Sequence, residues 1–396
     1  MAKGIYVGVG GVVRKAKKIY IGVNGVPRKV KKVFVGVGGV PKLVYSIGLE
    51  PVGVITPLSI SCPEAVGGSI GNTALFVGSS SATTYANVHS YDQSLVYRQL
   101  SNLSVKAMDM MSANVGNYII FTGGRYDDSS GDTSSNYKST AFDSSLVAIS
   151  APDLTNHVGS ANNQGVLFNE HAVFIGGTSY NDGSGFNPWD TYINSSLVNV
   201  AGLKYTYGDR RIAHGTAIAG NYCVFTGGIT KEGPYTSSPE IKSNEILRYD
   251  TSFVGARLTA TLDYPTTYIK GASVNGYALF AGGDEGVRSY TNKVYAIDSS
   301  LVKTMATPLI SPKYNVKSVT TSDYAIFFAG IGDGVNGGFA GESQVEYYDS
   351  SLVKTMTNNT NGVKRFTPAG AVTGNYFIIA GDDRGYNSTS AEAYEM

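Results

Sequence analysis

One strand pattern recurs seven times along residues 51 to 396: a short run of aromatic and aliphatic residues that ends in one or two glycines. The copies occupy residues 74–78, 119–124, 173–177, 224–228, 279–283, 327–330 and 378–381. Their spacing, roughly 45 to 55 residues, is the period expected of four-stranded antiparallel blades arranged around an axis. The pattern therefore predicts an all-β fold, a β-propeller with seven blades.

A second motif marks one turn of the repeating unit. Near-copies of Asp-Ser-Ser-Leu-Val stand at residues 92–96, 143–147, 194–198, 250–254, 298–302 and 349–353. Asp and Ser side chains can hydrogen-bond to their own backbone and close a tight hairpin. Each unit then reads as strand A, strand B ending in glycine, strand C ending at the Asp of the motif, and strand D beginning at Leu-Val.

The last unit stops at Met396, where its fourth strand should begin. A matching strand D stands at the other end of the region, because residues 52–58 resemble residues 301–309. We therefore expect the ring to close in a shared blade, in which the N-terminal segment supplies strand D and the C-terminal residues supply strand C. Such closure leaves only short, protected sheet edges.

The segment before the propeller contains three 14-residue copies, at residues 3–16, 17–30 and 31–44. Each resembles Lys-Lys-Ile-Tyr-Ile-Gly-Val, followed by Asn-Gly or Gly-Gly and then Val-Pro-Arg-Lys-Val. Asn-Gly between two β-prone runs is a strong signal for a two-residue hairpin turn. The sequence thus predicts a β-hairpin arm over residues 1–45, a linker over 46–50 and a propeller over 51–396.

The arm carries ten basic residues and no acidic one, so the overall net charge of +1 conceals a basic arm on an acidic propeller. Three interpretations remain open: docking to a partner protein or self-assembly around an axis, nucleic-acid binding, and an extension without a specific role. We favour docking, because so small a segment buries little core alone and no recognition helix is present. The anchor candidates are Tyr6, Arg14, Lys15, Tyr20, Arg28, Lys29, Phe34 and Lys42.

The connections between strands B and C are long and unlike one another, whereas the A-to-B and C-to-D connections are short. In a meander blade the B-to-C and D-to-A connections emerge on the same side, where binding residues are expected. The ligand-binding candidates are Arg125, Tyr126, Asp182, Trp189, Arg211, Arg288, Tyr290, Arg365, Arg384 and Tyr386. Aromatic rings near carboxylates suit sugars, so the expected ligand is a host cell-surface glycan; the alternative is that these residue types merely build long loops.

Composition excludes several classes of protein. Charged residues make up 15% of the chain, and no apolar run is long enough to cross a bilayer. The basic and apolar start of the chain repeats twice more, which indicates structure rather than a secretion signal. Cys62 and Cys223 are expected as buried free thiols, and the four histidines fall at unlike positions. We expect no metal, no cofactor and no catalytic residue.

Two resemblances follow from these motifs. The tandem Lys-Lys-Ile-Tyr-Ile-Gly-Val-Asn-Gly-Val-Pro-Arg-Lys-Val units look like repeats in tail and other virion-associated proteins of phages and prophages of Gram-positive bacteria, including phage-tail-like particles. The remainder resembles kelch-like propellers. Kelch repeats usually carry a Tyr and a Trp at set positions after the glycine pair, whereas this chain has the single Trp189. This departure argues against a standard kelch adaptor.

These resemblances imply a non-enzymatic virion component, such as part of a baseplate or tail fibre, made in the bacterial cytoplasm without a secretion signal. The arm would bind other virion or tail proteins, and the propeller would contact the host surface, with no membrane insertion. The alternatives are a glycan-processing propeller enzyme and a cellular kelch-type interaction module. An enzyme would show an acidic or metal cluster at the channel mouth on the loop-rich side.

Overall fold

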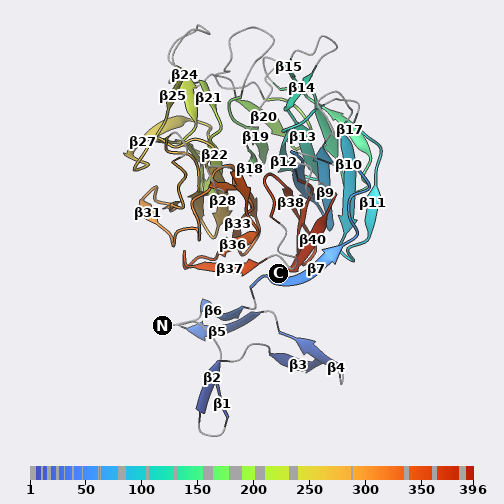
Figure 1. Ribbon diagram of the computed structural model, residues 1–396, viewed down its shortest axis with the longest axis vertical. Helices are drawn as coiled ribbons and strands as arrows, with labels where there is room; N and C mark the ends of the chain where they lie inside the picture. Colours follow the sequence, from blue (N-terminus) through green and yellow to red (C-terminus); the bar gives the residue numbers. More distant parts are fainter. Residues whose placement is uncertain are drawn as a thin grey trace.

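The computed structural model consists of β-strands and their connections, with no helix in the part of the chain it describes. That part comprises residues 6–9, 12–15, 19–23, 26–30, 32–37, 40–46, 48–60, 62, 64–78, 86–103, 107–127, 133–154, 164–177, 190–200, 210–231, 240–286, 289–333, 339–358, 364–382 and 389–396. Most strands belong to four-stranded antiparallel sheets arranged as in a β-propeller (Figure 1). The predicted all-β class is therefore confirmed.

The sheets follow one another along the chain. Four-stranded sheets are formed by β8 (Val66–Ile70), β9 (Thr73–Gly78), β10 (Asn87–Asp92) and β11 (Tyr97–Gln99); by β12 (Met111–Val115), β13 (Tyr118–Thr122), β16 (Ser139–Phe142) and β17 (Ala148–Ala151); by β22 (Gly215–Ala219), β23 (Tyr222–Thr226), β26 (Glu245–Tyr249) and β27 (Gly255–Thr261); by β28 (Lys270–Val274), β29 (Tyr277–Ala281), β30 (Val294–Ile297) and β31 (Lys303–Met305); and by β32 (Lys317–Thr320), β33 (Ala325–Phe328), β36 (Gln344–Tyr348) and β37 (Lys354–Asn358). A three-stranded sheet contains β18 (Gly165–Phe168), β19 (His171–Phe174) and β20 (Thr191–Asn194).

One further four-stranded sheet joins the two ends of the propeller. It consists of β38 (Ala369–Thr373), β39 (Tyr376–Ala380), β40 (Ala391–Glu395) and β7 (Glu50–Ile55). The N-terminal strand β7 pairs antiparallel with the C-terminal strand β40, as the sequence comparison predicts. The innermost strands contact one another in the order β8, β12, β18, β22, β28, β32, β38 and back to β8, so they surround a central channel.

The core lies between neighbouring sheets, because every strand presents alternate residues to each side. At the seam between the closing sheet and the first sheet, Phe76 and Tyr91 pack with Ile378 in one buried cluster. The two cysteines, Cys62 and Cys223, are buried free thiols, as expected. This packing ties the chain ends together through side chains as well as through the strand ladder.

The Asp-Ser-Ser-Leu-Val turns adopt one conformation. In a representative turn the Asp298 carboxylate accepts hydrogen bonds from the backbone N–H groups of Ser300 and Val302, at 2.9 Å each. Leu301 has a φ of +64°, a region that L-residues enter at a cost. Its side chain packs against the core cluster between two sheets. Burial of an apolar side chain offsets the backbone strain and explains why the motif keeps Leu where Gly would be easier.

The glycines that end strand B are needed for close approach. Gly227 and Gly228 have φ values of +72° and +90°. A Cβ atom on Gly228 would lie 2.5 Å from the carbonyl oxygen of Ile212. Chain crowding at a left-handed backbone therefore explains why these positions hold glycine.

The two ends of the channel differ. The plain face is the end at which the A-to-B turns and the Asp-Ser-Ser-Leu-Val turns lie, and the loop-rich face is the opposite end, with the B-to-C and D-to-A connections. Small extra sheets extend the loop-rich face. Two of them are seen in Figure 1: β14 (Arg125–Asp127) with β15 (Thr133–Ser135), and β21 (Arg210–Ile212) with β24 (Ile229–Lys231) and β25 (Glu240–Lys242). A third consists of β34 (Ile331–Asp333) and β35 (Phe339–Gly341).

The arm forms three antiparallel hairpins, as predicted from its three repeats. They are β1 (Tyr6–Val9) with β2 (Val12–Lys15), β3 (Tyr20–Val23) with β4 (Val26–Lys29), and β5 (Lys32–Val37) with β6 (Val40–Ser46). Pro27 stands opposite Gly22, and Pro41 stands opposite Gly36. In two-stranded ribbons every strand is an edge, which is where proline is tolerated.

Candidate functional site at the channel mouth

A cavity of about 150 Å³ lies at the loop-rich end of the channel. By strand register, one residue from each repeat occupies an equivalent position around this end. It lies at the start of the innermost strand or, for Gln164, just before that strand. These residues are Val66, Met111, Gln164, Gly215, Lys270, Lys317 and Ala369. All except Gly215 line the cavity. Apolar or small residues occupy most of these positions, so the two lysines and the glutamine distinguish one side of the mouth.

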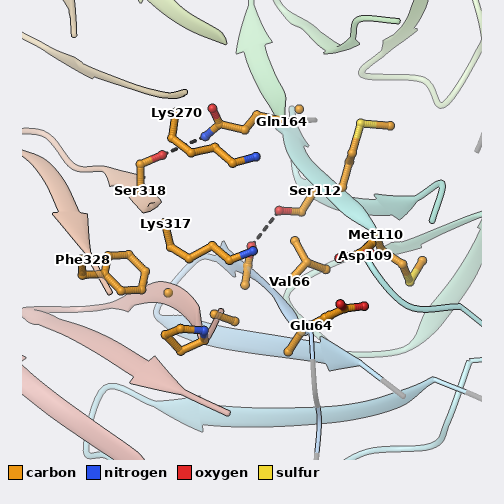
Figure 2. Close-up of a pocket in the computed structure, with 17 residues that line it drawn as sticks. Glu64, Val66, Asp109, Met110, Ser112, Gln164, Lys270, Lys317, Ser318 and Phe328 are labelled. Atoms are coloured by element: carbon orange, nitrogen blue, oxygen red, sulfur yellow. Dashed lines mark hydrogen bonds between the residues drawn. The ribbon is translucent and has the colours of Figure 1, made fainter. Parts of the chain in front are cut away.

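The two lysines begin neighbouring strands, β28 and β32, and reach into the same space (Figure 2). Lys270 is 4% exposed. Burial and the nearby charge of Lys317 lower the pKa of Lys270 to about 7, and the carboxylate of Asp109 partly opposes this shift. Burial lowers the pKa because it penalises the charged form of an amine. The Lys270 amine therefore changes charge close to neutral pH.

A carboxyl pair, Glu64 and Asp109, lies across the cavity from the lysines (Figure 2). Arg125 binds both: its Nη2 is 2.8 Å from a Glu64 oxygen and its Nε is 3.0 Å from an Asp109 oxygen. Burial and the neighbouring Asp109 raise the pKa of Glu64 to about 7, although Arg125 acts in the opposite direction. The mouth thus contains a carboxyl group with a raised pKa, Glu64, and an amine with a lowered pKa, Lys270, on opposite walls.

Gln164 crosses between blades. Its Nε2 donates to the Ser318 hydroxyl at 2.8 Å and to the Gly271 carbonyl at 3.1 Å, and its Oε1 accepts from the Gly271 N–H at 2.8 Å. On the opposite wall the Ser112 hydroxyl donates to the Gly67 carbonyl at 2.7 Å. The Gln164 bonds join the start of β18 to β28 and β32, which are not its neighbours in the ring, whereas the Ser112 bond joins the adjacent strands β12 and β8.

Of the residues predicted to bind a ligand, the structure brings Arg125 to the mouth, through its bonds to Glu64 and Asp109. Tyr126 follows it on β14 and is half-buried. Tyr290 stacks on Tyr314, with ring centroids 4.7 Å apart, and Tyr314 meets Tyr268 edge to face at 5.8 Å. Since Tyr268 precedes Lys270 by two residues, this half-buried aromatic group belongs to the same end of the channel.

Arg211 and Arg365 have a structural role that differs from the expected one. Each is 2% exposed. Arg211 donates to the Gly227 carbonyl at 2.8 Å and pairs with Glu245 at 3.1 Å. Arg365 donates to the Gly381 carbonyl at 2.9 Å and pairs with Glu392 at 3.0 Å. Each guanidinium group thus links the glycine at the end of strand B with a glutamate on strand C of the same blade. Its hydrogen bonds are made inside the fold.

Other predicted residues lie elsewhere. Asp182, Trp189, Arg288, Arg384 and Tyr386 fall outside the described residues. The anchor candidates all lie on strands of the arm, namely Tyr6 on β1, Arg14 and Lys15 on β2, Tyr20 on β3, Arg28 and Lys29 on β4, Phe34 on β5 and Lys42 on β6.

The sequence analysis missed Glu64, Asp109, Gln164, Lys270 and Lys317. They come from five different repeats and fall in the D-to-A connections, from which only Arg211 and Arg365 were selected as candidates, or at the first position of strand A. A signal was present: the position held by Val66, Met111 and Ala369 in some repeats is lysine in two others. Aligning the repeats strand by strand would have identified those two lysines.

A second buried polar group lies away from the channel. The Cys62 sulfur is 3.2 Å from Nε2 of His89, whose Nδ1 is 2.9 Å from the Tyr97 hydroxyl. Burial raises the pKa of the Cys62 thiol to about 12 and lowers the pKa of His89 to about 4. A protonated thiol beside a neutral imidazole is not an activated nucleophile. Among the described residues, no group of three or more His, Cys, Asp or Glu side chains gathers as a metal site would require.

Comparison with known proteins bears on the fold alone. No protein-family model matches the chain, and no curated protein matches it. A solved structure of the protein YjhT is similar, with a TM-score of 0.56 and 12% sequence identity over 77% of this chain and 99% of the YjhT chain. The described residues include no helix that is long and apolar enough to cross a membrane.

Proposed function

We propose that this protein is an attachment component of a phage or phage-tail-like particle. The arm docks to a neighbouring virion protein, and a seven-bladed, kelch-like propeller presents its loop-rich face to the host surface, where a glycan is the expected ligand. The three-stranded sheet β18–β20 counts as the third blade of the ring. The protein is made in the bacterial cytoplasm and acts in the assembled particle.

The observation that carries this proposal is the placement of the arm. Glu50 pairs with Glu395, and Ile55 pairs with Ala391. Strand C ends at the plain face, so the chain passes from the arm into β7 at the plain face. The hairpins of the arm and the extra sheets of the loop-rich face accordingly lie at opposite ends of the molecule (Figure 1). A protein anchored by its arm would direct its channel mouth away from the particle.

Charge supports a protein partner for the arm. The ten basic and no acidic residues of the arm favour an acidic docking surface, which would also orient the encounter. Binding to nucleic acid would need groups that read or stack on bases, and the arm offers few. The same charge pattern also allows self-assembly, in which the acidic propeller of one copy binds the basic arm of another.

Co-sedimentation tests the proposal. Full-length protein and protein lacking residues 1–45 are each mixed with particles that were assembled without this component, and separately with intact host cells. We expect only the full-length protein to pellet with particles and both forms to pellet with cells. Undiminished particle binding by the truncated protein would contradict the role of the arm, and failure of both forms to pellet with cells would contradict the role of the propeller.

A glycan-processing enzyme is the second candidate, because the Glu64 and Asp109 pair meets the criterion of an acidic cluster at the channel mouth. The two carboxyl groups share Arg125 and are hydrogen-bonded to each other. That places them closer together than the separation of about 5 Å or more used by glycosidases with two carboxylates. A single proton transfer to or from a sugar is therefore the chemistry that the pair fits best. Glycan turnover by the native protein, abolished by Glu64→Gln, would favour this candidate.

A further inference from the structure

We propose that Lys270 and Lys317 bind a single oxyanion at the channel mouth, beside Gln164 and Ser318, whose N–H and O–H groups are already donated within the wall. The oxyanion is the carboxylate of an acidic sugar or the phosphodiester of a polymer such as a glycerol phosphate chain. This inference deepens the proposed host-surface role and rests on it for the source of the ligand. The binding of the anion itself depends only on the residues of the cavity.

The cavity itself is small, but it is open and shares Gly67, Ser112, Ser318 and Gly370 with a second hollow of about 430 Å³. A volume of about 150 Å³ corresponds to about five water molecules at their share of liquid volume. It admits one anionic group and part of the unit that carries it, while the rest of a polymer would lie over the loop-rich face. The tyrosine group formed by Tyr268, Tyr290 and Tyr314 lies at that face, and aromatic rings provide an apolar surface for such a chain.

The arrangement of the two lysines favours an anion. They start adjacent inner strands and point into one space (Figure 2), and their mutual repulsion contributes to the lowered pKa of Lys270. Bringing two like charges together costs free energy that an intervening anion recovers. Lys270 is 4% exposed and lines the cavity, so its side chain lies inside the mouth.

The opposite wall does not cancel this effect. Arg125 compensates one of the two carboxylates there, at 2.8 Å from Glu64 and 3.0 Å from Asp109. Burial also favours the neutral form of Glu64, with a pKa of about 7. A protonated Glu64 donates its proton to Asp109, so a hydroxyl of the ligand can still donate to a carboxyl oxygen on this wall. The site is thus cationic on one wall and polar on the other.

Binding should depend on pH. The charged groups around Lys270 are Lys317 on β32, Asp109 before β12, and the Glu64–Arg125 pair; His214, before β22, is fully buried, and burial, Arg211 and Lys270 lower its pKa well below the usual value. Between pH 8 and pH 6, Lys270 gains a proton and Glu64 gains one as well. The formal charge of the mouth, counted over Lys270, Lys317, Arg125, Glu64 and Asp109, changes from zero to plus two. An anion should therefore bind more tightly at pH 6.

Isothermal titration calorimetry with the full-length protein tests the site. The probes are sulfate, glucuronate, glycerophosphoglycerol and glucose, at low ionic strength and at pH 6 and pH 8, where the charges of these probes are constant. We expect sulfate to bind and glucose to bind at least about tenfold more weakly than glucuronate. Because a lysine with a pKa near 7 loses most of its charge between these pH values, sulfate affinity should be roughly tenfold lower at pH 8. The glucuronate and glycerophosphoglycerol arms distinguish a sugar carboxylate from a phosphodiester.

The variant Lys270→Met/Lys317→Met should lose at least about tenfold in sulfate affinity, while Lys138→Met, at an exposed pair with Asp153, should retain it. Thermal unfolding of each variant shows whether it is folded, and Lys317→Met alone keeps the test decisive should the double variant fail to fold. Sulfate affinity that is unchanged in both lysine variants would overturn the proposal. Sulfate binding together with no pelleting on cells would retain the oxyanion site and reject the host-surface role.

Discussion

The two faces of the propeller are built on different principles. On the plain face, one turn motif recurs: in all six copies the third residue donates its N–H to the side chain of the first, and the fourth residue is left-handed, as at Asp298 and Asp250. On the loop-rich face, the B-to-C connections differ in sequence, and the charged residues that line the cavity occur in only some of the repeats. The repeated turns build the ring, whereas residues that differ between the repeats form the cavity at the channel mouth. Lys270 and Lys317 are two of these residues.

The arm gives the same contrast in another form. It enters the propeller at the plain face through β7 and consists of near-identical hairpins, whereas no hairpin of this kind lies on the loop-rich face among the described residues. The account therefore separates three properties: ring closure, plain-face attachment and loop-rich-face binding. Each can be altered while the others are monitored.

The largest effect should come from the C-terminal edge of the closing sheet. Deleting residues 390–396 removes β40, which pairs with both β39 and β7 and buries Ala391, Ala393 and Tyr394. We expect the protein either to fail to fold or to melt on the order of 10 °C lower. Deleting residues 1–45 is the matched control and should leave the melting temperature nearly unchanged. Equal melting temperatures for the two truncated forms would contradict closure by β40.

A buried ion pair on the loop-rich side should contribute next. Arg365→Met leaves the Glu392 carboxylate, which is 1% exposed, without its guanidinium partner. Breaking a buried pair in this way costs about 3–5 kcal/mol of unfolding free energy. Lys138→Met breaks an exposed pair with Asp153 and should cost at most about 1 kcal/mol. Urea denaturation of both variants measures the difference; similar costs would mean that Arg365 is not part of the internal framework.

The channel mouth should make stability depend on pH. Glu64 has its pKa raised from 4.5 to about 7, so its ionisation destabilises the fold as pH rises through that interval. Lys270 has its pKa lowered from 10.5 to about 7, so stability returns as pH rises from 7 to 10.5.

The two groups together predict a minimum near pH 7. The double variant Glu64→Gln/Lys270→Met should therefore gain most stability at pH 7, on the order of 2 kcal/mol more than at pH 5 and about 3 kcal/mol more than at pH 10. Thermal unfolding at the three pH values provides the measurement. A gain in stability that is independent of pH would show that the pKa values of Glu64 and Lys270 do not differ between the folded and unfolded states.

The smallest effect should lie on the plain face. Asp298→Ala removes the acceptor for the N–H groups of Ser300 and Val302, which should cost about 1 kcal/mol. Because five other copies of the turn remain intact, the ring should stay closed and sulfate binding at the mouth should not change. Urea denaturation and calorimetry on the same sample check both statements, and a loss of sulfate affinity would show that the faces are coupled.

Repeated features could be predicted from the sequence, and single ones could not. The strands, the turns, the closing sheet and the hairpins of the arm each follow from a pattern that recurs, so local chemistry identified them. The site requires Glu64 and Lys317 to meet across a channel although about 250 residues separate them. Their convergence depends on the order of blades around the axis. Arg125 was proposed because it lies in a long loop, and the burial of Arg211 and Arg365 inside the fold could not be read from one loop sequence.

The central claim is that the plain face attaches and the loop-rich face is displayed. Cryo-electron microscopy of particles reconstituted with the full-length protein measures this orientation directly. The account predicts density for the arm between the particle and the plain face, with β14–β15 and the channel mouth directed outward. Density that places the loop-rich face against the particle, with the arm directed into solvent, would contradict it.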